Sequence, residues 1–327
     1  MQTIDLAYVG CGVHEELVAH VADQEGYYPD ERIHVAIHDG ESWETERLRR
    51  CATIGLGRTL VSRLTDGIGW KALCVNTHRP LFWFLGRANV NSMADLRGRR
   101  LAVHAAHTAP GCFARIVLRN HGLDPVPDLQ RIVRAPGDYQ MDLRRLREGS
   151  IDAAYVGGTL SPEQVAEEEG FRPLAWVSDH FPTVGIFVDP IHIPLDSPAL
   201  QALVRSNKRA LRPLAAQPSL AIDCIVSFLD GLTRDEAQRF YERYIGPYFT
   251  PDGHVDLDIA RQGIDAVAAE LGVASVAVDE VYLPSTESRR KAILAEAPWK
   301  YLRPRRPHFE GEGSEPPWVP SMTAGKI

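Results

Sequence analysis

The chain has 327 residues, of which 44% are hydrophobic and 24% are charged, an ordinary composition for a globular protein. The formal net charge at pH 7 is −7, and no basic stripe of the kind that marks a nucleic-acid-binding surface is visible. A chain of this length predicts two domains or one large α/β unit.

Targeting and cofactor signals are missing from the sequence. The start of the chain has no secretory-signal pattern, and no apolar run reaches the roughly 18 residues of a membrane span. Five cysteines without a C-x-x-C pair favour neither a disulfide framework nor a structural zinc site. No P-loop, G-x-G-x-x-G, G-x-S-x-G or H-E-x-x-H motif occurs. We therefore expect a cytoplasmic protein with no cofactor, no bound metal, no nucleic-acid partner and no membrane insertion.

The opening section alternates strands and helices. Apolar patterns and Gly breaks predict strands at 4–9, 33–38, 51–56, 70–75 and 81–86, and helices at 15–24, 45–50 and 59–64. This β-α-β-α-β order is typical of a largely parallel sheet covered by helices.

A second α/β section follows, and then a helical one. Strands are predicted at 101–104, 151–156, 174–177 and 184–188, and helices at 110–120, 143–147, 162–169, 200–215, 220–229, 234–244 and 257–271. Thr108 is placed to cap the helix at 110–120, and Gly122 lies just past its end. Residues 298–327 hold six prolines and little periodicity, which predicts an extended C-terminal arm.

Four stretches, at 95–103, 146–154, 181–188 and 200–216, resemble in order and spacing those of type II periplasmic binding proteins, in the sulfonate-binding and thiamine-precursor-binding subfamily. Asp-Leu-Arg-Gly-Arg-Arg-Leu-Ala-Val at 95–103 is similar to a stretch that opens their second lobe. Leu-Arg-Glu-Gly-Ser-Ile-Asp-Ala-Ala at 146–154 is similar to a second one, at the expected distance. Residues 181–188 look like the strand that returns to the first lobe, and 200–216 like the helix after it.

The resemblance implies an α/β fold of two lobes with mostly parallel sheets and a ligand cleft between them. Lobe one would comprise residues 1–86 and 187–297, lobe two 87–186, and the arm 298–327. Most relatives are receptors of ABC importers. A smaller set are cytosolic enzymes, among them aromatic sulfinate desulfinases and dihydroxyphthalate-type decarboxylases.

Cys11 is the main catalytic candidate. It lies between Gly10 and Gly12, where the first strand meets a helix whose N-terminus would stabilise a thiolate. In the desulfinases that this chain resembles, a nucleophilic cysteine occupies the corresponding place. His14, one turn further on, is the candidate base. The alternatives are an inert buried cysteine and a histidine that faces solvent.

Further candidates follow other predicted strands, and ligands of open α/β sheets bind at the carboxyl ends of strands. A loop after the 101–104 strand would hold an anionic group through backbone N–H groups and a hydroxyl. Arg58 would bind a carboxylate or sulfonate, and Trp43 would stack on an aromatic ring; a surface arginine and a packing tryptophan are the alternatives. The predicted substrate-binding set is Gly10, Gly12, Trp43, Arg58, Thr59, His104, His107, Thr108, Gly157, Gly158 and Thr183.

Two functions remain open at this point. The first is a cofactor-independent enzyme that removes an acidic group from a small anionic, aromatic or heteroaromatic substrate, with Cys11 as nucleophile or proton donor. The second is a solute-binding protein of the ABC-transporter type, or a ligand sensor, without catalysis. Whether the chain forms a homodimer is also open.

Overall fold

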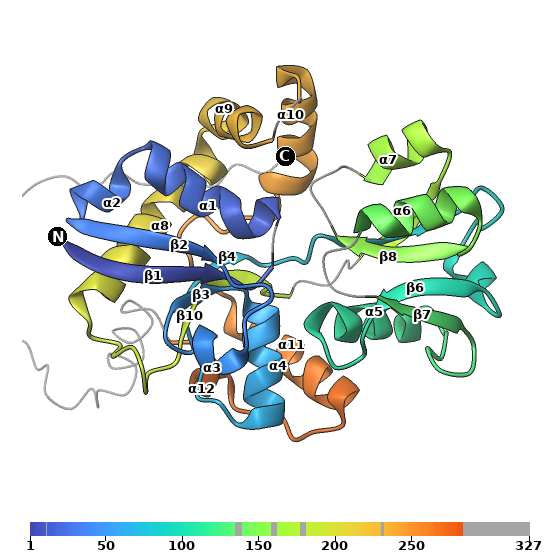
Figure 1. The fold of residues 1–327 in the computed structure, drawn as a ribbon, viewed down its shortest axis with the longest axis horizontal. Helices are drawn as coiled ribbons and strands as arrows, with labels where there is room; N and C mark the ends of the chain where they lie inside the picture. Colours follow the sequence, from blue (N-terminus) through green and yellow to red (C-terminus); the bar gives the residue numbers. More distant parts are fainter. Residues whose placement is uncertain (11, 135–138, 158–161, 177–180, 230–231, 284–327) are drawn as a thin grey trace, which may run out of the picture. The chain divides into compact units, whose positions relative to one another are not determined.

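The structure is a computed structural model that describes residues 1–10, 12–134, 139–157, 162–176, 181–229 and 232–283. Cys11, Gly158 and the predicted C-terminal arm at 298–327 lie outside these residues. Residues Met1–Leu283 form one compact unit built on two five-stranded sheets (Figure 1). The predicted α/β class is confirmed.

The first sheet has the strand order β2-β1-β3-β10-β4. Its strands are β1 (Gln2–Tyr8), β2 (Ile33–Asp39), β3 (Ala52–Ile54), β4 (Lys71–Thr77) and β10 (Val184–Val188). Strand β1 runs parallel to β2 and β3, whereas β10 is antiparallel to both of its neighbours, β3 and β4. The carboxyl ends of β1, β2 and β3 therefore meet at one edge.

The second sheet has the strand order β7-β6-β8-β5-β9. Its strands are β5 (Phe82–Gly86), β6 (Arg100–His104), β7 (Gln130–Arg134), β8 (Ala153–Gly157) and β9 (Arg172–Trp176). Strand β6 is parallel to β7 and β8, and β5 is antiparallel to β8 and β9. Each sheet thus carries one antiparallel strand that comes from a crossover.

The crossover strands correct the predicted lobe boundaries. We expected residues 81–86 in the first lobe, but Phe82–Gly86 pairs in the second sheet. Residues 184–188, of which 184–186 were assigned to the second lobe, pair in the first sheet as β10. The chain therefore passes to the second sheet at 78–81, just after β4, and returns between β9 and β10.

Helices cover both faces of both sheets (Figure 1). Those associated with the first sheet are α1 (Val13–Gln24), α2 (Tyr27–Asp30), α3 (Thr45–Leu48), α4 (Leu56–Asp66), α8 (Pro198–Ala216), α9 (Pro218–Phe228), α10 (Arg234–Phe240), the π-helical turn η2 (Tyr241–Ile245), α11 (Leu257–Leu271) and α12 (Val278–Val281). Those associated with the second are the short helix η1 (Met93–Leu96), α5 (Ala109–Asn120), α6 (Tyr139–Glu148) and α7 (Pro162–Glu169).

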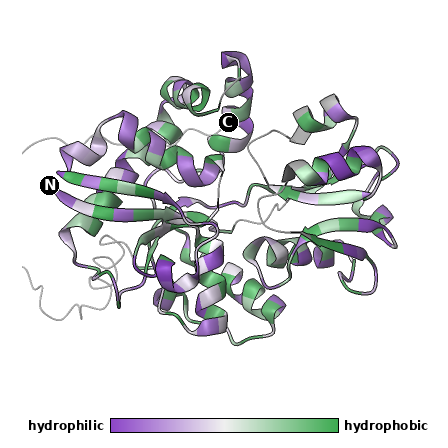
Figure 2. Cartoon of the chain, in the orientation of Figure 1, coloured by the Kyte–Doolittle hydropathy of each residue, from purple (hydrophilic) through white to green (hydrophobic). Residues whose placement is uncertain are grey.

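Hydrophobic residues run along the strands of both sheets, and hydrophilic residues gather on the helices that cover them, most clearly on α6 (Figure 2). This is the burial pattern that gives each sheet a core on both faces. No helix in the described part of the chain is both long enough and apolar enough to cross a bilayer.

Candidate functional site

Three loops meet at the carboxyl edge of the first sheet. Tyr8 pairs with Asp39 of β2 and with Ile54 of β3, so the residues that follow these strands are neighbours. The Gly40 N–H donates to the Tyr8 carbonyl at 2.8 Å. A Cβ at Gly40 would lie 2.8 Å from the Tyr8 carbonyl oxygen, a distance that only glycine permits. The sequence is therefore adapted to hold these loops against one another.

The loop from β1 to α1 carries Gly10 and Gly12 and, between them, Cys11, which lies outside the described residues. Helix α1 begins at Val13, and the Gly12 carbonyl accepts the N–H groups of Glu15 and Glu16 at 3.1 and 3.0 Å. The predicted strand-to-helix junction is present. The role of Cys11 stays a prediction.

Glu15 is the residue of this junction that sequence reasoning missed. Its Oε1 lies 3.7 Å from the position that a Cβ on Gly10 would take, and its Oε2 lies 3.0 Å from that of a Cβ on Gly12. Burial raises the pKa of the Glu15 carboxyl to about 7, and the nearby carboxylates of Glu16 and Glu41 add to the shift. The sequence signal that could have identified Glu15 is an acidic residue in the first turn of a helix that follows a Gly-x-Gly stretch.

His14 is enclosed by the helical segment that follows α10. It is buried, its Nε2 lies 3.0 Å from the Tyr244 carbonyl oxygen, and its ring packs on Tyr248 and Phe249 at centroid distances of 5.4 and 5.2 Å. Burial lowers the pKa of His14 to about 4, so the ring is neutral at pH 7. The alternative that His14 faces solvent is wrong. Its predicted role as a base stays untested by this geometry.

Arg58 holds the neighbouring loop. One guanidinium nitrogen lies 2.8 Å from the Glu41 carbonyl oxygen and 3.4 Å from that of Gly40, and the other donates to the Trp43 carbonyl. Burial lowers the pKa of this guanidinium. Because its two terminal nitrogens already donate to carbonyls, Arg58 fixes the 40–43 loop at the edge of the site.

Trp43 and Thr59 also have partners within the protein. The Arg47 guanidinium lies 3.4 Å from the centre of the Trp43 ring, and His38 packs against this ring at 5.4 Å. The buried Thr59 hydroxyl donates to carbonyls of the preceding turn of its own helix. The half-buried Trp43 thus packs against its own loop, as the second interpretation of this residue predicted.

The candidates around the second sheet take different positions. Thr108 caps α5 as predicted: its hydroxyl accepts the Gly111 N–H at 3.2 Å. His104 is buried beside Phe82 and Tyr155, whereas His107 is exposed. The other two candidates lie at the ends of strands. Gly157 ends β8, and the hydroxyl of Thr183, which directly precedes β10, lies 3.1 Å from the hydroxyl of Thr77.

Helices α4 and α5 join the two groups of candidates. A Cβ at Gly57 would lie 2.7 Å from the Ala109 Cβ, so the first turns of α4 and α5 touch. The Leu56 N–H donates to the Thr183 carbonyl at 2.9 Å. The structure therefore brings Gly10, Gly12, Trp43 and Arg58 to one edge, with Thr108 and Thr183 next to α4, and leaves His104 and Gly157 within the second sheet.

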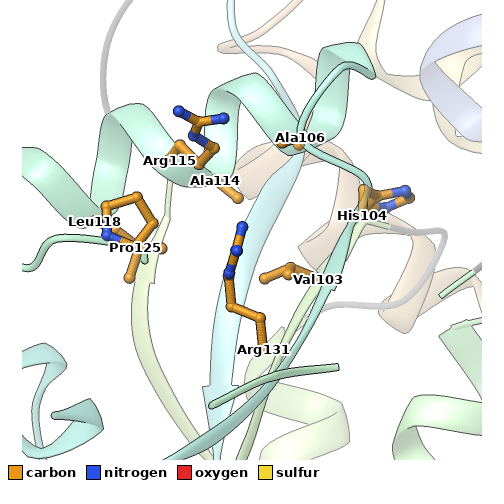
Figure 3. Close-up of a pocket in the computed structure, with 9 residues that line it drawn as sticks. Val103, His104, Ala106, Ala114, Arg115, Leu118, Pro125 and Arg131 are labelled. Carbon is orange, nitrogen blue, oxygen red and sulfur yellow. The ribbon is translucent and has the colours of Figure 1, made fainter. Parts of the chain in front are cut away.

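A small hollow lies beside β6 and α5 (Figure 3). His104, Arg115 and Arg131 contribute to its lining, and its volume is about 10 Å³, room for about one water molecule. Organic ligands occupy pockets of several hundred Å³. This hollow is therefore not the predicted ligand site.

Within the described residues, no group of three or more His, Cys, Asp or Glu side chains is arranged to hold a metal ion.

The two sheets of order 2-1-3-10-4 and 7-6-8-5-9, joined by crossover strands, define the class of this molecule: it has the periplasmic-binding-protein fold. No family model matches the sequence, and no curated protein matches it either. Three kinds of solved structure illustrate the likeness.

The alkanesulfonate-binding protein SsuA from Xanthomonas axonopodis pv. citri, bound to MOPS, superposes with a TM-score of 0.66 at 14% identity over 86% of this chain and 98% of that one. A conserved Candida albicans gene product with the generic periplasmic binding protein fold gives 0.65 at 15% identity, over 90% and 95%. The desulfurization enzyme DSZB gives 0.61 at 14% identity, over 89% and 100%. A cysteine-to-serine variant of DSZB has been solved with biphenyl-2-sulfinic acid. Solved structures with this fold thus include both binding proteins and an enzyme.

Proposed function

We propose that this protein is a cytoplasmic enzyme that removes an acidic group from a small anionic, aromatic or heteroaromatic substrate without a cofactor. Cys11 is its nucleophile. The observation that carries the proposal is the meeting of the β1, β2 and β3 ends at the loop that contains Gly10, Cys11 and Gly12. Carboxyl ends of strands are where ligands bind in open α/β sheets.

Two physical features of this loop support a reactive thiol. The glycines allow a ligand to approach the backbone closely, and the N-terminus of α1 follows directly and favours a thiolate. The DSZB structure lends further support, because a cysteine-to-serine variant of that enzyme was solved in complex with biphenyl-2-sulfinic acid.

Alkylation of the thiols tests the proposal. The other four cysteines are buried, and burial raises the pKa of each thiol, to about 11 for Cys74 and Cys112. Iodoacetamide at pH 7, followed by peptide mapping, should therefore modify Cys11 at least tenfold faster than any of them. Biphenyl-2-sulfinate should slow the modification. Equal rates at Cys11 and Cys51 would contradict a nucleophilic Cys11.

The second candidate function is a solute-binding protein, because alkanesulfonate-binding proteins superpose on this chain as well as DSZB does. The two functions predict different effects of replacing the Cys11 sulfur by oxygen. A binding protein keeps its ligand affinity when Cys11 is replaced by Ser and releases no product, whereas the enzyme keeps its affinity and loses turnover. Calorimetry and product analysis on the same variant separate them.

A further inference from the structure

The removal of an acidic group leaves a carbon that must be protonated. The bond from carbon to the acidic group breaks, its electron pair stays on the carbon, and the carbon takes a proton from an acid. The Cys11 thiolate bonds to the sulfur or carbon of the acidic group as this bond breaks. The adduct then releases sulfite after attack by water, or loses carbon dioxide, and restores the thiolate, while the acid becomes its conjugate base and is recharged from water. Such an enzyme therefore needs a group that still carries a proton at neutral pH.

Glu15 has the position that this role requires. Its two carboxyl oxygens lie next to Gly10 and Gly12, 3.7 and 3.0 Å from where a Cβ on each would be, just beyond the carboxyl end of β1. Glu15 as a whole is half-buried, neither sealed in the core nor fully exposed. The carboxyl group belongs to the first turn of α1.

The charges around Glu15 favour the protonated form. Glu16 lies beside it on α1, and Glu41 faces it from the loop after β2; both are acidic. In this loop the Arg58 guanidinium donates to the carbonyls of Gly40, Glu41 and Trp43. No ion pair joins Glu15 to a basic side chain among the described residues. The burial that raises its pKa is thus not offset by a cation.

We propose that Glu15 is the catalytic acid that delivers the proton to the substrate carbon as the acidic group leaves. This inference rests on the proposed function and goes one step further, because it assigns proton donation to a carboxyl group and leaves Cys11 as the nucleophile.

The first test measures protonation and access together. A water-soluble carbodiimide with methylamine converts protonated, accessible carboxyls to amides, which peptide mapping quantifies. In the full chain at pH 7, Glu15 should react at least tenfold faster than the exposed Glu44, because the raised pKa of Glu15, about 7, leaves about half of its carboxyl groups protonated at that pH. Biphenyl-2-sulfinate should protect Glu15. A rate at Glu15 equal to or below that at Glu44 overturns the inference.

The second test uses turnover of biphenyl-2-sulfinate, measured as release of sulfite and biphenyl. Glu15→Gln keeps the size of the side chain and should lower kcat by a factor on the order of 10² to 10⁴. Wild-type kcat should fall above pH 7, and the residual rate of Glu15→Gln should not change with pH there. Glu44→Gln is the matched control and should retain the wild-type rate. If Glu15→Gln also retains it, Glu15 is not the acid.

The two proposals fail separately. A reactive Cys11 beside an unmodified Glu15 contradicts only the acid, and an unreactive Cys11 beside a rapidly amidated Glu15 contradicts only the nucleophile. Should biphenyl-2-sulfinate not be turned over, the carbodiimide rates alone decide the state of Glu15. If Glu15→Gln does not fold, Glu15→Asp, which withdraws the carboxyl by one methylene, replaces it with the same expected loss.

Discussion

Glu15 and His14 are adjacent on α1, and burial shifts their pKa values in opposite directions. Burial pushes each towards its uncharged form, which for the carboxyl means a retained proton and for the imidazole a lost one. His14 is committed to the Tyr244 carbonyl and to two aromatic rings, whereas the Glu15 carboxyl lies along the glycine backbone. The two neighbours therefore face different parts of the molecule.

The raised pKa of Glu15 should appear as a pH-dependent free energy of unfolding. The folded protein binds this proton up to about pH 7, but the unfolded chain releases it near pH 4.5. The contribution of Glu15 to stability is therefore greatest below pH 4.5 and is lost as the pH rises to 7, by about 3 kcal/mol. Glu15→Gln lacks this loss. Urea unfolding of both proteins at pH 4.5 and pH 8 should show the variant gaining relative stability; a constant difference would mean that Glu15 has an ordinary pKa.

Arg58 should govern the order of the loop after β2. Lysine has a single nitrogen and cannot bond the carbonyls of Gly40, Glu41 and Trp43 together, so Arg58→Lys should loosen the loop. Hydrogen exchange at the Trp43 amide, which donates to Gly40, should accelerate at least tenfold. Arg50→Lys, a change at an exposed arginine, is the control and should leave this rate unchanged. Equal exchange rates of the Trp43 amide in Arg58→Lys and Arg50→Lys would show that Arg58 does not order this loop.

At the scale of helices and strands, the ends of α5 follow from local chemistry. Thr108 caps the helix with a side-chain hydrogen bond, and Gly122 follows the end at a φ of +72°. Thr108→Ala should lower the free energy of unfolding by about 1 kcal/mol, while Thr108→Ser should change it little. Urea unfolding measures both. Equal stability of Thr108→Ala and the wild type would show that the cap contributes nothing.

The elements that the sequence predicted best are those with strong local signals. The predicted bounds of α7, α11 and β10 coincide with those observed, because each combines a clear periodicity with Gly, Pro or Asp at its ends. Strand β7 was missed, since Gln130–Arg134 is an edge strand with three polar residues in five. The partners of Arg58 and His14 could not be predicted, because both depend on contacts between segments distant in sequence.

For the whole molecule, the two sheets are linked by an ion-paired contact between α5 and α11. The Glu270 carboxylate, whose side chain is 5% exposed, lies 2.5 Å from Arg115 and 3.1 Å from Arg119. Phe113 and Phe181 pack nearby at a centroid distance of 4.8 Å. Helix α5 covers the second sheet and α11 belongs with the first, so this contact helps to fix one sheet against the other.

Glu270→Gln should therefore cost about 3 kcal/mol of unfolding free energy, because it leaves the partly buried Arg115 without its carboxylate. The control is Glu280→Gln, which breaks the more exposed pair with Arg63 inside the first lobe and should cost less than about 1 kcal/mol. Both values come from urea unfolding. Similar losses in the two variants would contradict a special role for Glu270.

The location of the crossovers is also a property of the whole chain. Residues 82–86 follow the first-sheet strands directly and read as one more of them, but they form hydrogen bonds with β8 and β9. A local apolar pattern predicts that a strand exists and says nothing of which sheet it joins. The fold class was predictable from the order of motifs, and the edge of each lobe was not.

The measurement that tests the central claim most directly is turnover by Cys11→Ser. Wild type, Cys11→Ser and Cys112→Ser are incubated with biphenyl-2-sulfinate and with a panel of hydroxylated phthalates, and release of sulfite or carbon dioxide is followed at pH 7. We predict turnover of at least one compound by the wild type and by Cys112→Ser, and a loss of at least about 10³-fold in Cys11→Ser with its ligand affinity retained. Full activity of Cys11→Ser, or tight binding of these compounds by all three proteins without any product, would contradict the account.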